Sequence, residues 1–277
     1  MRVPAAFSSA VRPVLTGPIQ PAAWLGASAG AAYLMTGSST VLAIVTHDAV
    51  RLPCALVLST TAAELALSEL APAPGLRGDA PASVGAGRVE WPGRGGPVTV
   101  AGTREWAPAR VLAQGPPRRA AVAALSSAVL QCDIGVGVGG AVSALALAGD
   151  PGAQFDAVAA LLGRGPGLTP SGDDVVTGFL LGARAFGRAV PGAAAAVLEL
   201  ARDATSALSA QLLHDAVDGL CIPEVAAAVA ELAGRIAPAH AGRRLLAVGH
   251  TSGAALAAGL VSAATCLHRP LAVGGAA

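Results

Sequence analysis

The sequence contains no lysine, so arginine supplies all 18 of its Lys and Arg residues. This absence excludes a Schiff-base lysine, a lysine general base and a P-loop that holds phosphate with lysine. Asp and Glu total 17, which leaves a formal net charge of only +1. The arginines are scattered and form no basic stripe interleaved with aromatic residues. We therefore expect no nucleic-acid partner.

Aromatic and charged residues are scarce, at 3% and 13%, whereas hydrophobic residues make up 53% of the 277 positions. The hydrophobic content comes mainly from Ala, Val and Leu. Small side chains allow helices to pack at short distances, so we expect a compact helical region and an oligomer. The length is enough for one large domain or two ordinary ones.

The four cysteines are far apart and include no C-x-x-C pair. They are Cys54, Cys132, Cys221 and Cys266. This spacing is typical neither of a zinc site nor of a disulfide framework. It favours reduced, mostly buried thiols in a cytoplasmic protein.

Neither a signal peptide nor a membrane span is predicted. Pro4, Pro13 and Pro18 interrupt the N-terminal segment, so it has no continuous apolar stretch. Residues 245–267 are apolar and long enough to cross a membrane, but the sequence GHTSG at 249–253 interrupts them. We expect a buried helix there and no membrane contact.

The first part of the chain has the pattern of a β-rich domain. Two β-branched runs within residues 41–60 predict two strands, and residues 88–112 contain three more short runs separated by glycine turn signals. Residues 60–70 suggest a short helix and residues 72–87 a loop. An antiparallel barrel or sandwich is the expected architecture.

The second part of the chain is helical by pattern. Helices are expected near residues 118–131, 152–163, 171–188, 192–218, 222–236 and 251–267, with prolines at the breaks. The predicted fold class is α+β, with a β-rich domain over 1–118 followed by an all-α domain over 119–277.

The sequence GRGPGLTPSGDD, residues 163–174, is the strongest candidate for a functional site. Its three glycines allow positive φ or close approach to a ligand, and Ser171 begins an apolar-periodic helix. A glycine-rich loop before a helix N-terminus suits an anion. It is neither a Walker A loop nor G-x-G-x-x-G. The expected substrate-binding residues are Arg164, Gly165, Gly167, Leu168, Thr169, Ser171 and Gly172.

Asp173 and Asp174 end this segment, and the pattern leaves several roles open for them. Carboxylates in a first helical turn commonly complement the helix dipole. Two together also suit a Mg²⁺ ion that bridges to phosphate, a hydrogen bond from a substrate amide, or a base. Adjacent helical residues point about 100° apart, so one is expected to face the site while the other caps or pairs. Both are candidate catalytic residues, and no cofactor other than Mg²⁺ is expected.

A second segment, GHTSG at residues 249–253, opens another apolar helix and resembles the first. Both helices contain S-G-x5-G, which runs from Ser171 to Gly178 and from Ser252 to Gly259. The repeat indicates either an internal duplication or chance among abundant small residues. A duplication would direct two helix N-termini at one ligand.

His250 in this segment is a candidate catalytic acid or base, or an anion donor, and the alternative is a histidine at a helix cap. Thr251, Ser252 and Gly253 are expected to contact the substrate.

Weaker candidates lie elsewhere in the chain. Thr205, Ser206 and Ser209 precede or begin a helical run that also holds His214 and Asp215. The glycine-rich residues 135–140 are interpreted as a turn rather than a phosphate loop.

Five other residues in the β part favour structural roles. They are His47, Asp48, Trp24, Trp91 and Trp106. A place for His47 at the border of a cleft between domains is the alternative.

GRGPGLTPSGDD, GFLLG, TSALS and GHTSG together resemble the family that includes the AllH-type subunit of oxamate carbamoyltransferase, an activity of anaerobic allantoin breakdown. The resemblance covers roughly residues 119–267. It implies work beside FdrA-like and AllG-like subunits, with a carbamoyl group exchanged between oxalurate and phosphate. The family's signature positions would be Gly165, Gly167, Thr169, Ser171, Asp173, Asp174, His250, Thr251 and Ser252.

The residues and the resemblance both point to a small anionic substrate. A carbamoyltransferase-type enzyme or subunit is the first hypothesis, with the anion held at helix N-termini. The chain lacks the S-T-R-T phosphate motif of ordinary carbamoyltransferases, so its site would have another architecture. The alternatives are a stand-alone lyase, cyclase or hydrolase, and a non-catalytic ligand-binding subunit.

Overall fold

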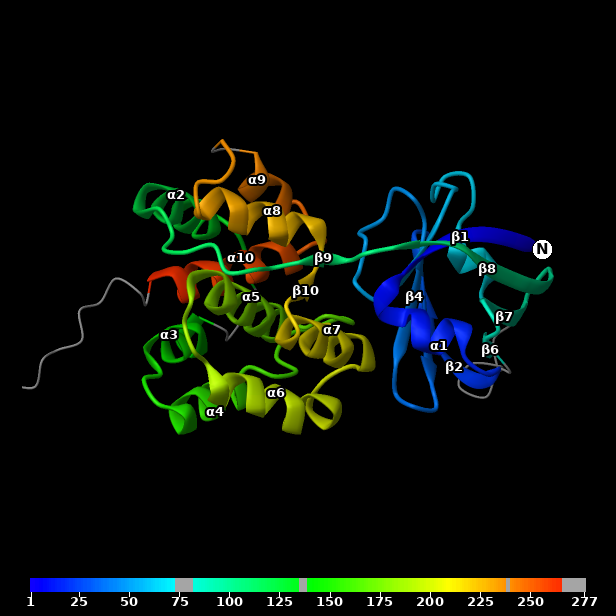
Figure 1. Cartoon of the computed structure of the whole chain (residues 1–277), viewed down its shortest axis with the longest axis horizontal. Helices are drawn as coiled ribbons and strands as arrows, with labels where there is room; N and C mark the ends of the chain where they lie inside the picture. The colour runs from blue at the N-terminus through cyan, green and yellow to red at the C-terminus, as the bar shows by residue number, and fades with distance from the viewer. Residues whose placement is uncertain (73–81, 135–138, 238–239, 266–277) are drawn as a thin grey trace, which may run out of the picture. The chain divides into compact units, whose positions relative to one another are not determined.

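A computed structural model describes residues 1–72, 82–134, 139–237 and 240–265. The chain forms two compact units, Met1–Ala109 and Arg110–Ala277 (Figure 1). We call them the barrel unit and the helical unit. The domain boundary that the sequence suggested, near residue 118, falls inside the helical unit.

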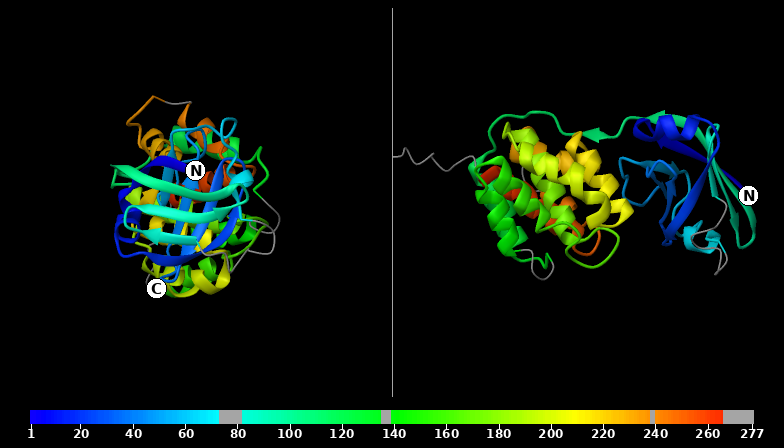
Figure 2. Two further views of the ribbon diagram at one scale, coloured as in Figure 1. Left: turned by 90° about the vertical axis from the view of Figure 1, so that its right-hand side faces the viewer. Right: turned by 90° about the horizontal axis from the view of Figure 1, so that it is seen from below.

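The barrel unit is a closed sheet of eight strands in the order β1-β5-β4-β3-β2-β6-β7-β8 (Figure 2). The strands are β1 (Arg2–Ser8), β2 (Gln20–Ala27), β3 (Ala31–Thr36), β4 (Val41–Val45), β5 (Ala55–Leu58), β6 (Ala82–Gly85), β7 (Arg88–Gly93) and β8 (Gly96–Trp106). The short helices are η1 (Ser9–Val11), α1 (Arg12–Thr16) and η2 (Leu67–Leu70). Closure leaves no unpaired sheet edge. A barrel was one of the two predicted architectures.

Two strand pairs differ from the antiparallel sheet that was predicted. The pairs β4–β5 and β1–β8 are parallel, and the second of them closes the barrel. The prediction failed here because alternation along a strand shows which face is buried, but not the direction of its neighbour.

Local detail in this unit also differs from the sequence pattern. Residues 88–93 are a strand as expected, but β8 continues through Gly102, which was taken as a turn signal. A Cβ at Gly102 would lie 2.9 Å from side-chain atoms of Leu15 and of Phe7. The glycine therefore marks close packing rather than a turn. Within residues 60–70 only η2 is helical.

The interior of the barrel contains two of the three tryptophans. Trp24 and Trp91 are 4% and 2% exposed, and their ring centroids are 5.4 Å apart. The indole N–H of Trp91 donates to the Leu70 carbonyl at 2.7 Å. These contacts support the structural role predicted for this pair.

The helical unit places α5 and α10 between α2, α8 and α9 on one side and α4 and α6 on the other (Figure 1). Its helices are α2 (Arg119–Val129), α3 (Gly139–Leu147), α4 (Pro151–Ala159), α5 (Ser171–Phe186), α6 (Pro191–Ala204), α7 (Ala207–Val217), α8 (Pro223–Leu232), α9 (Ala241–Leu246) and α10 (Ser252–Thr265). The remaining short strands are β9 (Ala109–Arg110) and β10 (Leu220–Cys221). None of the helices within the described ranges combines the length and hydropathy of a membrane span.

The predicted helix over 192–218 is divided into α6 and α7 at Thr205 and Ser206. Ser206 has extended backbone and caps α7, because its hydroxyl accepts from the Ser209 N–H at 3.1 Å. Serine is a preferred cap residue, so this break could have been read from the sequence. Helices α3 and α9 were not predicted. Gly139 and Gly140, the end of the predicted glycine turn, instead begin α3, and positions 135–138 of that turn lie outside the described residues.

The described cysteines fit the interpretation of buried thiols. Cys54 and Cys221 are buried and Cys132 is partly exposed, whereas Cys266 lies outside the described residues. Burial raises the pKa of the Cys221 thiol to about 12. That thiol therefore stays protonated at neutral pH, which makes it a poor nucleophile.

Candidate functional site

The loop before α5 needs its glycines, as the sequence indicated. Gly163, Gly165 and Gly167 have φ of +71°, +116° and +95°. A Cβ at Gly163 would lie 2.2 Å from the Ala204 carbonyl oxygen, and one at Gly165 would lie 2.8 Å from the Ser171 nitrogen. The first two glycines thus let the loop contact the end of α6 and the start of α5. At Gly167 a Cβ would meet nothing within 4 Å, so only its positive φ favours glycine.

Helices α5 and α10 begin in the same way. The N–H of Gly172 donates to the Arg164 carbonyl at 2.8 Å, and the N–H of Gly253 donates to the Val248 carbonyl at 2.9 Å. A Cβ on these glycines would lie 2.0 and 1.9 Å from a carbonyl oxygen of the preceding segment. The backbone at the start of each helix therefore packs closely against the chain segment that precedes it.

Farther along, the same two helices touch backbone to backbone. A Cβ at Gly178 would lie 2.1 Å from the Leu256 carbonyl oxygen, and one at Gly259 would lie 2.1 Å from the Val175 carbonyl oxygen. Gly178 thus meets the residue three positions before Gly259, and Gly259 meets the residue three positions before Gly178. The second glycine of each S-G-x5-G pattern therefore allows the two helix backbones to meet closely.

Four hydroxyl groups meet where the two helices begin, and we call them the hydroxyl cluster: Thr169, Ser171, Thr251 and Ser252. The Oγ atoms of Thr169 and Ser252 are 3.1 Å apart, and Ser171 Oγ donates to Thr251 Oγ1 at 3.3 Å. The structure therefore brings together the two segments that the sequence singled out, 80 residues or more apart along the chain.

Asp174 lies beside this cluster and is almost completely buried. Its side chain interacts with the Ser252 hydroxyl, its residue is 7% exposed, and its Oδ2 has no hydrogen-bond partner within the described structure. Burial raises the pKa of this carboxyl to about 8, and the nearby charge of Asp173 acts in the same direction. At neutral pH the group is mostly protonated and can donate a proton, or accept one once ionised.

Asp173 has different surroundings, with both of its carboxylate oxygens in hydrogen bonds. Oδ1 accepts from the Gly163 N–H at 2.7 Å, while Oδ2 accepts from the hydroxyls of Thr205 and Ser209, the latter at 2.7 Å. Burial raises the pKa of Asp173, and these three hydrogen bonds oppose the rise. These contacts fix the glycine-rich loop to the α6–α7 junction.

Asp173→Ala is expected to lower the free energy of unfolding by roughly 3 kcal/mol, because it leaves one buried and two partly buried donors without an acceptor, at about 1–3 kcal/mol for a buried donor. Asp173→Asn should cost less, since its amide can still accept from the Gly163 N–H while the two hydroxyls turn to accept. Urea denaturation followed by circular dichroism measures both. Equal stability of the two variants would contradict this role for the carboxylate.

The other predicted site residues lie around the loop or outside the cluster. Arg164 Nε donates to the Ala160 carbonyl, and the Leu168 carbonyl accepts from the Ser206 hydroxyl. His250 is exposed, and its ring has no hydrogen-bond partner among the described residues. It stands next to the cluster in sequence, and neither of its predicted roles is visible in its contacts.

His214 and Asp215 on α7 do not join the hydroxyl cluster. Burial lowers the pKa of His214. Asp215 Oδ1 accepts from the Gln211 amide at 3.0 Å, and burial raises the pKa of this carboxyl to about 7. Nor does the described part of the chain contain a group of three or more His, Cys, Asp or Glu side chains that would hold a metal ion.

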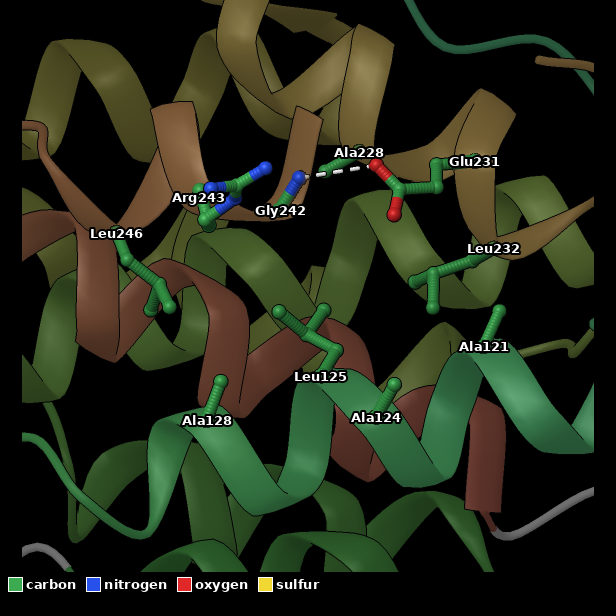
Figure 3. Close-up of a pocket in the computed structure, with 10 residues that line it drawn as sticks. All are labelled: Ala121, Ala124, Leu125, Ala128, Ala228, Glu231, Leu232, Gly242, Arg243 and Leu246. Carbon is green, nitrogen blue, oxygen red and sulfur yellow. Dashed lines mark hydrogen bonds between the residues drawn. The ribbon is translucent and has the colours of Figure 1, made fainter. Parts of the chain in front are cut away.

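A cavity of about 230 Å³ lies between α2, α8 and α9 (Figure 3). Its walls are mainly apolar, with Leu125, Leu232 and Leu246 among them. Oε2 of Glu231 accepts from the N–H groups of Ala241 and Gly242 at 2.8 and 3.1 Å, so this carboxylate caps the start of α9. None of the predicted site residues lines the cavity, and its one carboxylate, that of Glu231, already caps a helix.

Comparison with known protein families places the hydroxyl cluster and both aspartates in one matched region. Residues 161–264 match the family oxamate carbamoyltransferase subunit AllH. The AllH match confirms the resemblance noted in the sequence, over a shorter range. It runs from the glycine-rich loop almost to the end of α10 and leaves the barrel unit unmatched. No curated protein and no solved structure matches the chain.

Within the AllH region, sequence reasoning gave Thr205 and Ser209 only a weak role, although both hold Asp173. The available signal was the resemblance of TSALS to the family pattern. Hydrogen bonds that join residues 32 and 36 positions apart cannot be inferred from local spacing.

Proposed function

We propose that this chain is a carbamoyltransferase-type enzyme, or a subunit of one, which binds a small anionic amide or carbamoyl substrate where α5 and α10 begin. One observation carries the proposal. The buried carboxyl of Asp174, with an oxygen left unpaired, lies beside four hydroxyls from both helix starts, within the AllH region.

The surroundings of Asp174 suit both ends of such a substrate. Two helix N-termini side by side present partial positive charge to a carboxylate or phosphate, and the hydroxyl cluster supplies donors that can turn toward it. Oδ2 of Asp174 is available to a substrate –NH₂ or –NH– group. An exchange of hydrogen bonds within the cluster would free these hydroxyls for the ligand.

With oxalurate and phosphate, which the AllH resemblance implies, the proposed step is a direct transfer. A phosphate oxygen attacks the carbon of the terminal carbamoyl group, and the bond from that carbon to the internal nitrogen breaks. Protonated Asp174 gives its proton to the departing nitrogen, so that oxamate and carbamoyl phosphate leave. In the reverse direction the Asp174 carboxylate accepts a proton from the oxamate amide as its nitrogen attacks. A pKa of about 8 suits both directions near neutral pH.

Reconstitution tests the proposal. The full chain, combined with the FdrA-like and AllG-like subunits that the AllH resemblance implies, should form carbamoyl phosphate from oxalurate and phosphate, and omission of the chain should abolish formation. Ser252→Ala should slow the reaction roughly 10-fold, on the scale of about 1.4 kcal/mol for one lost hydrogen bond. Parallel assays with EDTA and with added Mg²⁺ decide whether a metal ion takes part.

The same assay separates the competing functions. Tight binding of oxamate by the chain, with turnover unaffected by Ser252→Ala, would indicate a ligand-binding subunit. Activity of the partner proteins without this chain would reject the carbamoyltransferase role, and a lyase, cyclase or hydrolase would then become the leading hypothesis.

A further inference from the structure

The barrel unit contains a second concave site, which the AllH match does not reach. A hollow of about 510 Å³ lies along β1, β5 and β8, and every residue that lines it belongs to the barrel unit. Its size is in the range of small-molecule sites. The polar lining includes His47, Arg51, Thr103 and Arg104, with Trp106 at the end of β8.

A β-bulge shapes this hollow. Along the β1–β8 pair, Ala5 is opposite Gly102 whereas Ala6 is opposite Arg104, so Thr103 is the extra residue of β8. The Thr103 hydroxyl donates to the Ala5 carbonyl at 3.1 Å, which fixes the bulge. Bulges often redirect side chains next to functional sites. Here the bulge sets Thr103 and Arg104 along the hollow.

Neither arginine that lines the hollow belongs to an ion pair within the described structure. In the described part of the chain, the ion pairs of the barrel unit are Arg12–Glu105 and Arg88–Glu90, at 3.1 and 3.2 Å. Neither includes Arg51 or Arg104. Two guanidinium groups therefore share one concave surface without a carboxylate partner.

Trp106 lines the hollow, but its one side-chain donor is not exposed there. The indole Nε1 of Trp106 is buried and has no hydrogen-bond partner within the described structure. Asp48, which follows His47 in sequence, uses its carboxylate to accept from the Ala62 N–H at 3.0 Å. The two arginines thus give the hollow N–H donors and positive charge, which suit an oxyanion.

We infer that this hollow binds a small molecule through a carboxylate or phosphate group, held by Arg51 and Arg104. A guanidinium group presents paired N–H donors that match two oxygens of such a group. The inference is independent of the proposed transferase function, because it concerns residues outside 161–264.

Tryptophan fluorescence of the full chain tests this inference. Trp24 and Trp91 are buried inside the barrel, so Trp106 should report on the hollow. Titration with oxalate and, separately, with inorganic phosphate should give a saturable change in emission with at least one of them. The preferred probe tells whether carboxylate or phosphate is the ligand group. Trp106→Phe should abolish the change in emission.

Arginine variants provide the matched comparison. Arg51→Gln and Arg104→Gln should each weaken binding about 10-fold, which corresponds to about 1.4 kcal/mol. Arg94→Gln removes an exposed arginine of the β7–β8 turn outside the hollow. This variant should bind like the wild type. No saturable signal with either probe, or equal loss in Arg94→Gln, would overturn the inference.

Discussion

Gly178→Ala is expected to destabilise the helical unit, although alanine is normally the better helix former. The gain in helix propensity is at most about 1 kcal/mol. Against it, the new Cβ would lie 2.1 Å from the Leu256 carbonyl oxygen. That oxygen belongs to a helix backbone, so α5 and α10 would have to separate. Overpacking of this kind costs about 1–3 kcal/mol, and more where the backbone cannot move. A net loss of roughly 2 kcal/mol or more follows.

The reciprocal contact sharpens this prediction. Gly259→Ala should cost a similar amount, because its Cβ would meet the Val175 carbonyl oxygen at the same distance of 2.1 Å. The double variant should cost less than the sum of the two, since the first substitution already separates the helices.

Gly140→Ala is the matched control, because it changes a helical glycine of α3 whose Cβ would meet nothing within 4 Å. It should be neutral or stabilise by up to ~1 kcal/mol. Urea denaturation followed by circular dichroism at 222 nm compares all of these variants. Wild-type stability in Gly178→Ala would show that α5 and α10 do not touch at this position.

Asp174→Asn is expected to reduce carbamoyl transfer by the assembled enzyme roughly 100- to 10,000-fold, the range for loss of a general acid or base. Asparagine is close in shape to the protonated carboxyl and can keep the hydrogen bond with Ser252, but it cannot transfer a proton. The variant should therefore fold and still bind oxamate. Ser171→Ala, which removes one hydroxyl of the cluster, should have a smaller effect on the rate.

The same substitution should change how stability depends on pH. Asp174 has a folded-state pKa of about 8 and an ordinary value of 3.8. Between these values the folded chain binds more protons than the unfolded chain, so stability falls as pH rises through this window, by up to ~1.4 kcal/mol per pH unit. Asp174→Asn should flatten that fall.

Asp215→Asn is the control for this pair of effects. Asp215 is also buried and its pKa is raised to about 7, so its loss should flatten the pH dependence of stability too. Because Asp215 lies outside the hydroxyl cluster, transfer should continue at the wild-type rate. A large loss of transfer in Asp215→Asn, together with normal transfer in Asp174→Asn, would show that Asp174 is not the proton donor.

Local chemistry in the sequence was enough to predict the parts of the site that depend on neighbours in the chain. The positive φ of Gly163, Gly165 and Gly167, and the helix that begins at Ser171, follow from residue type and short-range pattern. The repeat that begins at Ser252 was also visible. Its meaning became clear only from the reciprocal backbone contacts between α5 and α10.

Contacts between distant segments account for what the sequence did not reveal. The two adjacent aspartates look equivalent in sequence, yet Asp173 is held by three hydrogen bonds and Asp174 has an unpaired oxygen. Likewise, the parallel pairing of β1 with β8 depends on barrel closure between the first and last strands of the sheet. The pattern of a single strand carries no information about such a partner.

The most direct measurement is a crystal structure of the full chain with oxamate. We predict the oxamate carboxylate among the hydroxyls where α5 and α10 begin, and its –NH₂ group within hydrogen-bond distance of Asp174 Oδ2. Oxamate bound elsewhere on the helical unit, with the Thr169–Ser252 and Ser171–Thr251 contacts unchanged, would contradict the account.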